Sequence, residues 1–221
     1  MLLKNKAMVS MAALTLAGGT VMLSMSGANA ATIRCGSACQ TLASQKFGAT
    51  NVVSVGSSST GELAPFYYDE SEDFYPQLEG NVSELAKAGA IAHSVAKTYG
   101  SDQVYQYVYS PAGNATDKCL GATEGSSAVT LVPCGATANS LWVTLGGWKS
   151  GNFEPLLSAA LSVNSAMLLT ASTASGALAV TQMNLGTTVS NGVSTTSPSS
   201  VQMWETVNGA YGSSTTGGQQ G

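Results

Sequence analysis

Four cysteines are the residues of this sequence whose type and spacing point most clearly to chemistry: Cys35, Cys39, Cys119 and Cys134. An even number of cysteines in an oxidising compartment favours disulfide bonds, and four cysteines allow three pairings. Redox pairs usually have two intervening residues, whereas Cys35 and Cys39 have three. A zinc site would need a second cluster of ligands, but the sequence has one histidine, His93. We therefore expect disulfides, no metal site and no cofactor.

Residues that carry catalysis in other proteins do not form a recognisable set here. His93 falls within a predicted helix, and no serine stands in a Gly-x-Ser-x-Gly pattern. The acidic run at residues 69–73 lacks the ligand spacing and the turn glycine of an EF-hand, so a solvated turn is favoured over a Ca²⁺ site. No pair of carboxylates stands out as the acid and nucleophile of a glycosidase. The sequence predicts no catalytic residue and a protein that is not an enzyme.

Aromatic side chains are the best candidates for contact with a ligand. Tyr105, Tyr107 and Tyr109 alternate with other residues across Gln103–Tyr109, which predicts a strand with its tyrosines on one face. The tyrosine row could stack on sugar rings, although packing against the protein's own helix is favoured. Trp148 stands in a predicted turn and is the tryptophan most free to contact a ligand. The candidate ligand-binding residues are therefore Trp148, Tyr105, Tyr107 and Tyr109.

Two helices and many short strands are expected to position these residues. Ser37–Phe47 is predicted to form a short N-terminal helix, and Ser83–Tyr99 a longer one, because its apolar residues recur at steps of three and four. Gly100 is expected to end the longer helix. The remaining chain consists of strand-like runs separated by Gly and Ser, with a long polar loop near residues 186–200. The fold class is therefore mostly β.

The strand-like runs repeat as three units, at residues 52–75, 118–143 and 168–205. Each unit has an apolar strand, a turn, a second strand and an aromatic residue near its end. The spacings join Val53 to Phe74, Leu120 to Trp142 and Leu169 to Trp204. Three small units of this kind would share one central core, as in a β-trefoil. We expect a β-trefoil core with the short N-terminal helix and one inserted helix added to it.

The second unit resembles one repeat of the ricin-type β-trefoil lectins at Cys119-Leu120, the strand Val129–Leu131, Cys134 and Trp142. The sequence Gln202-Met203-Trp204 matches the family's Gln-x-Trp signature. The resemblance implies a disulfide between Cys119 and Cys134, which would leave Cys35 and Cys39 to pair with each other. The chain also resembles, more faintly, uncharacterised secreted bacterial proteins whose mature sequence begins with Cys-Gly-Ser-x-Cys.

The resemblance also bears on sugar binding. Lectins of this family use an Asp early in each repeat to accept hydrogen bonds from sugar hydroxyls. The corresponding positions here hold Ser54, Gly121 and Thr170, none of which is acidic. We therefore expect the usual galactose site to be absent, and any sugar binding to rely on aromatic stacking and to favour extended polysaccharide.

The N-terminus has the pattern of a cleavable signal peptide over residues 1–30: two lysines, an apolar run and Ala28-Asn29-Ala30. A trefoil-like domain is expected over 31–211 and a disordered tail over 212–221. Removal of Lys4 and Lys6 leaves 6 basic and 12 acidic residues, a net charge of −6, which argues against nucleic acid as a partner.

The expected localisation is secreted and extracellular, with no membrane span after cleavage. The expected function is a secreted non-catalytic binding module for cell-wall or environmental polysaccharide. The alternatives are a secreted structural or protein-interaction protein and a small secreted hydrolase.

Overall fold

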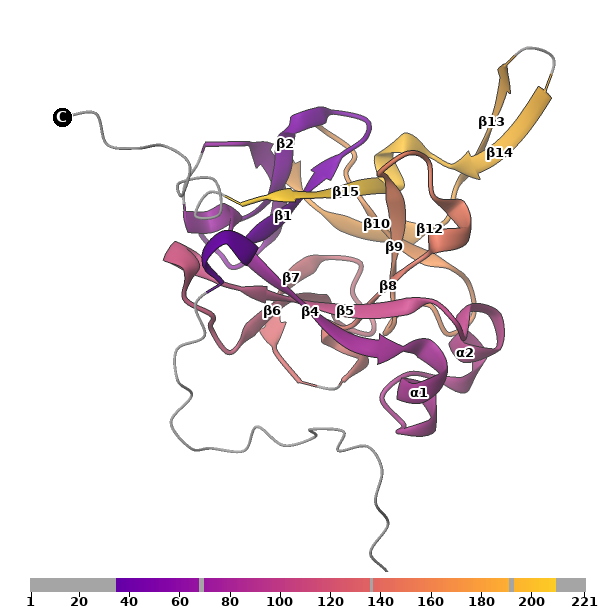
Figure 1. The fold of residues 1–221 in the computed structure, drawn as a ribbon, viewed down its shortest axis with the longest axis horizontal. Helices are drawn as coiled ribbons and strands as arrows, with labels where there is room; N and C mark the ends of the chain where they lie inside the picture. Colours follow the sequence, from indigo (N-terminus) through magenta and orange to yellow (C-terminus); the bar gives the residue numbers. More distant parts are fainter. Residues whose placement is uncertain (1–34, 68–69, 136, 191–192, 210–221) are drawn as a thin grey trace, which may run out of the picture.

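The computed structural model describes residues 35–67, 70–135, 137–190 and 193–209 (Figure 1). The predicted signal peptide and the predicted C-terminal tail lie outside these residues. The described part is mostly β, as predicted, and it contains two short α-helices.

Six strands pair in a closed ring. This barrel lies at the centre of the fold (Figure 1). Each strand pairs antiparallel with the next around the ring, and the last pairs with the first. In ring order the strands are β1 (Gln40–Ser44), β4 (Phe74–Asn81), β5 (Gln103–Tyr109), β8 (Trp142–Thr144), β9 (Glu154–Ser158) and β15 (Met203–Asn208). Closure satisfies the edge hydrogen bonds that an open sheet would expose.

Three hairpins precede three of the barrel strands and meet at one end of the barrel. They are β2–β3 (Gly48–Val55, Gly61–Pro65), β6–β7 (Lys118–Ala122, Val129–Pro133) and β10–β12 (Met167–Thr170, Ala179–Gln182). Bridges between Thr60 and Thr130 and between Ala128 and Ala179 tie the hairpins to one another, as does pairing of β11 (Gly176–Ala177) with β3. The strands of the three predicted units are therefore present.

The aromatic residue that ends each unit is buried, and the two tryptophans bond to their own hairpins. The indole nitrogen of Trp142 donates to the carbonyl of Leu120 (2.9 Å), and that of Trp204 donates to the carbonyl of Leu169 (2.9 Å). These are the pairs that the sequence spacing joined. Phe74 has no N–H group and instead contacts the ring of Tyr109, with centroids 5.8 Å apart.

The register shows how the smaller Phe74 is accommodated. Trp204 pairs with Ser44 and Trp142 pairs with Ser158, whereas Phe74 pairs with Tyr109. Two units thus combine a large aromatic with a small serine, and the third combines a smaller aromatic with a tyrosine. Equal filling of the barrel interior explains this exchange, because protein cores are close-packed.

The predicted N-terminal helix over Ser37–Phe47 is wrong. A short 3₁₀ turn occupies Gly36–Ala38, and β1 follows it at once. All five residues of β1 pair with β15, so strand pairing across the barrel overrides the local helical pattern.

The predicted helix over Ser83–Tyr99 is two helices, α1 (Val82–Lys87) and α2 (His93–Tyr99). Asn81 and Glu84 form a reciprocal capping box that starts α1. Gly89 ends it with a φ of +79°, a left-handed conformation that glycine adopts without strain. The chain then turns before α2, so the apolar stripe is divided between two helices.

Two further expectations are corrected. Glu72 and Asp73 are each 1% exposed, so this part of the acidic run is not a solvated turn. The Glu72 carboxylate accepts the backbone N–H of Tyr67 (2.6 Å), as the Gln202 side chain accepts that of Asn184 (2.9 Å) in the third unit. The predicted polar loop near residues 186–200 is a ribbon of β13 (Leu185–Ser190) and β14 (Val193–Pro198) that projects from the barrel (Figure 1).

Disulfide bonds join Cys119 to Cys134 and Cys35 to Cys39, which confirms both predicted pairings. The first bond links the two ends of the β6–β7 hairpin. Five further 3₁₀ turns complete the described elements: Glu70–Glu72, Pro111–Gly113, Ala138–Ser140, Gly146–Trp148 and Ser200–Gln202. Within the described ranges, no helix has the length and apolar character needed to cross a membrane.

Candidate binding site at the open end of the barrel

Inward-facing side chains of the barrel change from apolar near the hairpins to polar at the other end. On β8 the first inward residue is Trp142 and the next is Thr144. On β9, which runs in the opposite direction, Leu156 lies deeper and Glu154 lies nearer the other end. We call the end away from the hairpins the open end.

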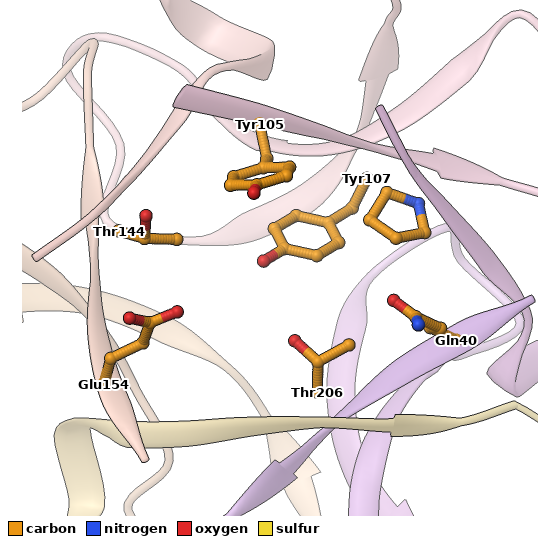
Figure 2. Close-up of a pocket in the computed structure, with 7 residues that line it drawn as sticks. Gln40, Tyr105, Tyr107, Thr144, Glu154 and Thr206 are labelled. Atoms are coloured by element: carbon orange, nitrogen blue, oxygen red, sulfur yellow. The ribbon is translucent and has the colours of Figure 1, made fainter. Parts of the chain in front are cut away.

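A cavity of about 230 Å³ occupies the open end (Figure 2). All six barrel strands contribute to its wall. The lining residues are Gln40 from β1, Pro76 from β4, Tyr105 and Tyr107 from β5, Thr144 from β8, Glu154 from β9 and Thr206 from β15.

Tyr107 forms the floor of this cavity. Its side chain is 4% exposed and its ring belongs to the apolar core, while its hydroxyl points toward the cavity (Figure 2). Burial raises the pKa of the Tyr107 hydroxyl, and the negative charge of Glu154 raises it further. The group therefore stays protonated and can donate a hydrogen bond to a ligand.

Glu154 supplies the carboxylate of the site and points into the cavity from β9 (Figure 2). Burial raises its pKa, the positive charge of Lys149 opposes this shift, and the negative charge of Asp102 adds to it. In the described ranges, no side chain or backbone group donates a hydrogen bond to this carboxylate. It is therefore an available acceptor in a partly dry environment.

The other polar lining residues differ in whether their side chains already form hydrogen bonds within the protein. Tyr105 donates its hydroxyl to the Gln103 side chain (2.9 Å), and Thr144 donates to the Gln103 carbonyl (3.3 Å). Gln40 and Thr206 have no side-chain hydrogen bond to any described residue. A ligand could therefore bond to Gln40, Thr206, Tyr107 and Glu154 without displacing an internal partner.

The structure places the four predicted binding residues in three different settings. Tyr105 and Tyr107 line the cavity together. Tyr109, on the same face, packs against Phe74 in the core. Trp148 is partly buried against a second apolar cluster beside the helices, so it is not the free surface aromatic that the sequence suggested.

The tyrosine row does not pack against the helices, which corrects a further expectation. The three tyrosine side chains belong to the cluster inside the barrel. Val104, on the opposite face of β5, belongs to the cluster formed with α1 and α2. His93 is exposed at the start of α2 and does not line the cavity.

Sequence reasoning missed Gln40, Thr144, Glu154 and Thr206. Each comes from a separate short strand, and only closure of the barrel brings them together. The sequence signal for Glu154 is weak, because the five residues of β9 are too few for a clear alternation.

The positions where ricin-type lectins carry a sugar-binding Asp are closed in this fold. Ser54, Gly121 and Thr170 are all buried. A Cβ atom at Gly121 would clash with the carbonyl oxygen of Asn139, so no larger side chain fits there. Ser54 and Thr170 engage the hydroxyls of Ser71 (2.7 Å) and Thr181 (2.8 Å).

No cluster of three or more His, Cys, Asp or Glu side chains that could hold a metal ion occurs among the described residues. All four cysteines are in disulfides, so they supply no thiolate ligand.

Comparison with known proteins yields no family model that matches this chain and no matching curated protein. Among solved structures, the chain is similar to a mosquitocidal holotoxin (14% identity, TM-score 0.49), with 77% of this chain and 17% of that chain covered. It is also similar to the cytolethal distending toxin of Haemophilus ducreyi (14% identity, TM-score 0.44), with 83% and 92% covered. The chain thus spans less than a fifth of the holotoxin chain that it matches.

The resemblance to ricin-type lectins is therefore wrong as a family assignment. No family model matches, and the two solved structures named above are described as toxins. The fainter likeness to secreted bacterial proteins with a Cys-Gly-Ser-x-Cys start finds no support either, since no curated protein matches.

Proposed function

We propose that this protein is an exported, non-catalytic binding module whose open-end cavity holds a polyhydroxylated group, such as the terminal residue of a glycan. The observation that carries the proposal is the convergence of unpaired polar groups from separate barrel strands beside the rings of Tyr105 and Tyr107. Ligand sites commonly combine an apolar or aromatic wall with a few convergent polar groups.

The chemistry of the lining suits sugar hydroxyls, which both donate and accept hydrogen bonds. Glu154 accepts, Gln40 does both, and the hydroxyl of Tyr107 does both. The tyrosine rings offer apolar faces against which the C–H groups of a sugar ring can pack. None of these contacts depends on the closed lectin positions described above.

The size of the cavity narrows the ligand. A volume of about 230 Å³ is below the roughly 300–1,000 Å³ of sites for drug-sized ligands. It favours one ring or a chain end rather than the extended polysaccharide that the sequence suggested. The cavity therefore suits the terminal residue of a glycan.

A non-catalytic role is supported by the composition of the lining. Glycosidases of the common type use two carboxyl groups that flank the scissile bond. Among the described lining residues Glu154 is the one carboxylate, and no serine, cysteine or histidine accompanies it. The wall therefore lacks the second carboxyl group that a glycosidase of this type would need.

Export is supported by the pattern of residues 1–30 and by the two disulfides, since such bonds persist in oxidising compartments.

We also propose that the fold has β-trefoil topology. The six-stranded barrel with its three hairpins supports this proposal.

A glycan array followed by calorimetry tests the proposed function. We expect binding to glycans through their terminal residue, about tenfold or more weaker in Tyr107→Phe, which removes a hydroxyl from the floor. Glu124→Gln, in the exposed β6–β7 turn, is the matched control and should bind as the wild type does. Absence of binding to any glycan, or equal binding by Tyr107→Phe, would contradict the proposal.

A further inference from the structure

The open-end cavity has an electrostatic asymmetry that narrows its ligand class. We propose that it selects a ligand with an ammonium group, such as an amino sugar at a glycan terminus, and that Glu154 is the counter-ion. This inference rests on the proposed function and specifies the substituent that the same site recognises.

Among the residues that the structure describes, none forms an ion pair with the Glu154 carboxylate. The ion pair found in the described ranges joins Lys118 to Asp117 (3.6 Å), and neither residue lines the cavity. Lys149 influences Glu154 electrostatically, but its ammonium lies beyond ion-pair distance and its side chain is exposed. A charge that is half-buried without a partner favours a ligand that brings the opposite charge.

The charged groups around Glu154 leave the site negative. Asp102, in the turn before β5, adds a second negative charge, and Lys149 contributes one positive charge from the solvent side. The whole chain carries 12 acidic and 8 basic residues, so its overall field also attracts cations.

The aromatic wall suits the same kind of ligand. The rings of Tyr105 and Tyr107 and the Glu154 carboxylate face one cavity (Figure 2). A cation within about 6 Å of a tyrosine ring is attracted by the negative π-face. An ammonium between the carboxylate and the rings would therefore interact favourably with both, whereas a neutral acetamido group would gain neither interaction.

The three units show that the fold does not demand this carboxylate. Leu42, Tyr107 and Leu156 occupy corresponding positions, paired with Thr206, Pro76 and Thr144. The residues two places before them are Gln40, Tyr105 and Glu154. Two of the three corresponding places thus carry neutral side chains. The charge at Glu154 is a local feature of the cavity rather than a structural necessity of the repeat.

The test compares three probes that share one ring and differ at one substituent: a methyl glucosaminide with a free amine, its N-acetylated form and methyl glucoside. Binding is measured by NMR titration of the full chain at about pH 6, where the amine is cationic. We expect the free amine to bind about tenfold more tightly than either neutral probe. Glu154→Gln should abolish that preference, and Glu124→Gln should preserve it.

Glu154→Gln should fold normally, because glutamine has the same shape and loses no internal partner; a thermal melt verifies this. The variant Tyr105→Leu is a second test and should reduce the preference for the free amine by removing one ring.

Equal or tighter binding of a neutral probe would overturn the ammonium inference and leave the proposed function standing. Binding of none of the probes would overturn the ammonium inference. A negative glycan array would overturn the proposed function separately.

Discussion

The two ends of the barrel use the same six strands for opposite purposes. At the hairpin end, Trp142 and Trp204 are buried and each indole N–H has a backbone acceptor. At the open end, Tyr107 and Glu154 face a cavity and have no hydrogen-bond partner among the described residues. Alternation along each strand keeps both sets pointing inward, so a step of two residues separates structural from available side chains.

This difference predicts that substitutions at the hairpin end destabilise the fold more than substitutions at the open end. The hairpin end must fill space and satisfy every buried donor, so its residues are interdependent. The open end contacts solvent through the cavity, and the side chains of Gln40, Glu154 and Thr206 have no hydrogen bond to a described residue to lose. We therefore expect substitutions to separate into those that unfold the protein and those that alter binding.

The largest effect is expected for Trp142→Ala at the hairpin end. It removes a fully buried indole and leaves the Leu120 carbonyl without its donor, so we expect a loss of about 3–5 kcal/mol of unfolding free energy. Tyr107→Phe at the open end should lose much less, because its hydroxyl has no internal partner. Urea denaturation measures both. Similar losses for the two variants would break the distinction between the ends.

Loss of the Cys119–Cys134 bond should have the next largest effect. The bond spans 15 residues, for which chain entropy predicts about 3 kcal/mol of stabilisation. The double variant Cys119→Ser/Cys134→Ser should show this loss in urea denaturation while its relative affinity for any ligand is kept. A change in ligand preference would show that the hairpin end shapes the cavity.

The third prediction tests whether Tyr109 compensates for the small size of Phe74. The other two units pair a tryptophan with a serine at the corresponding positions. Phe74→Trp alone should overpack the core and cost about 1–3 kcal/mol. Adding Tyr109→Ser should recover most of that loss by reproducing the pairing found in the other units. Additive losses in the double variant, measured by thermal unfolding, would refute the proposed compensation.

The smallest effect concerns the pH dependence of Glu154. Burial raises its folded-state pKa above the ordinary value of 4.5. Between these two pKa values the folded state holds more protons than the unfolded state, so stability falls as pH rises across that window. Glu154→Gln should therefore lose less stability than the wild type as the pH rises above 4.5.

Glu79 and Asp102 have pKa values raised in the same direction by burial, so the wild type retains part of this slope in any variant. The difference between the two melting profiles isolates Glu154. Parallel profiles for wild type and Glu154→Gln would show that its carboxylate is as well solvated in the folded state as in the unfolded state.

Much of the hairpin end could be predicted from sequence because its signals are local. The spacings from Leu120 to Trp142 and from Leu169 to Trp204 aligned residues that the structure joins by indole hydrogen bonds, although the bonds themselves were not predicted. The cysteine pairings were also correct, although the family resemblance that suggested the first is not supported. Helix boundaries failed where Gly89 and the pairing of β1 with β15 decided the structure.

The open end could not be predicted in the same way. Tyr105 and Tyr107 were visible as an alternating row, but the row alone does not tell which face points into a barrel. Glu154 is 47 residues beyond Tyr107 in the chain and joins it only through closure of the strands. Residues brought together by non-local pairing leave no local pattern.

The central claim, that the open end is the binding site, is tested most directly by mapping bound ligand with backbone NMR. A glycan found by the array should shift the amide signals of Tyr105, Tyr107 and Glu154 while leaving those of the β6–β7 hairpin unchanged. Shifts confined to the hairpins near Ser54, Gly121 or Thr170, with the open-end signals unmoved, would contradict the account.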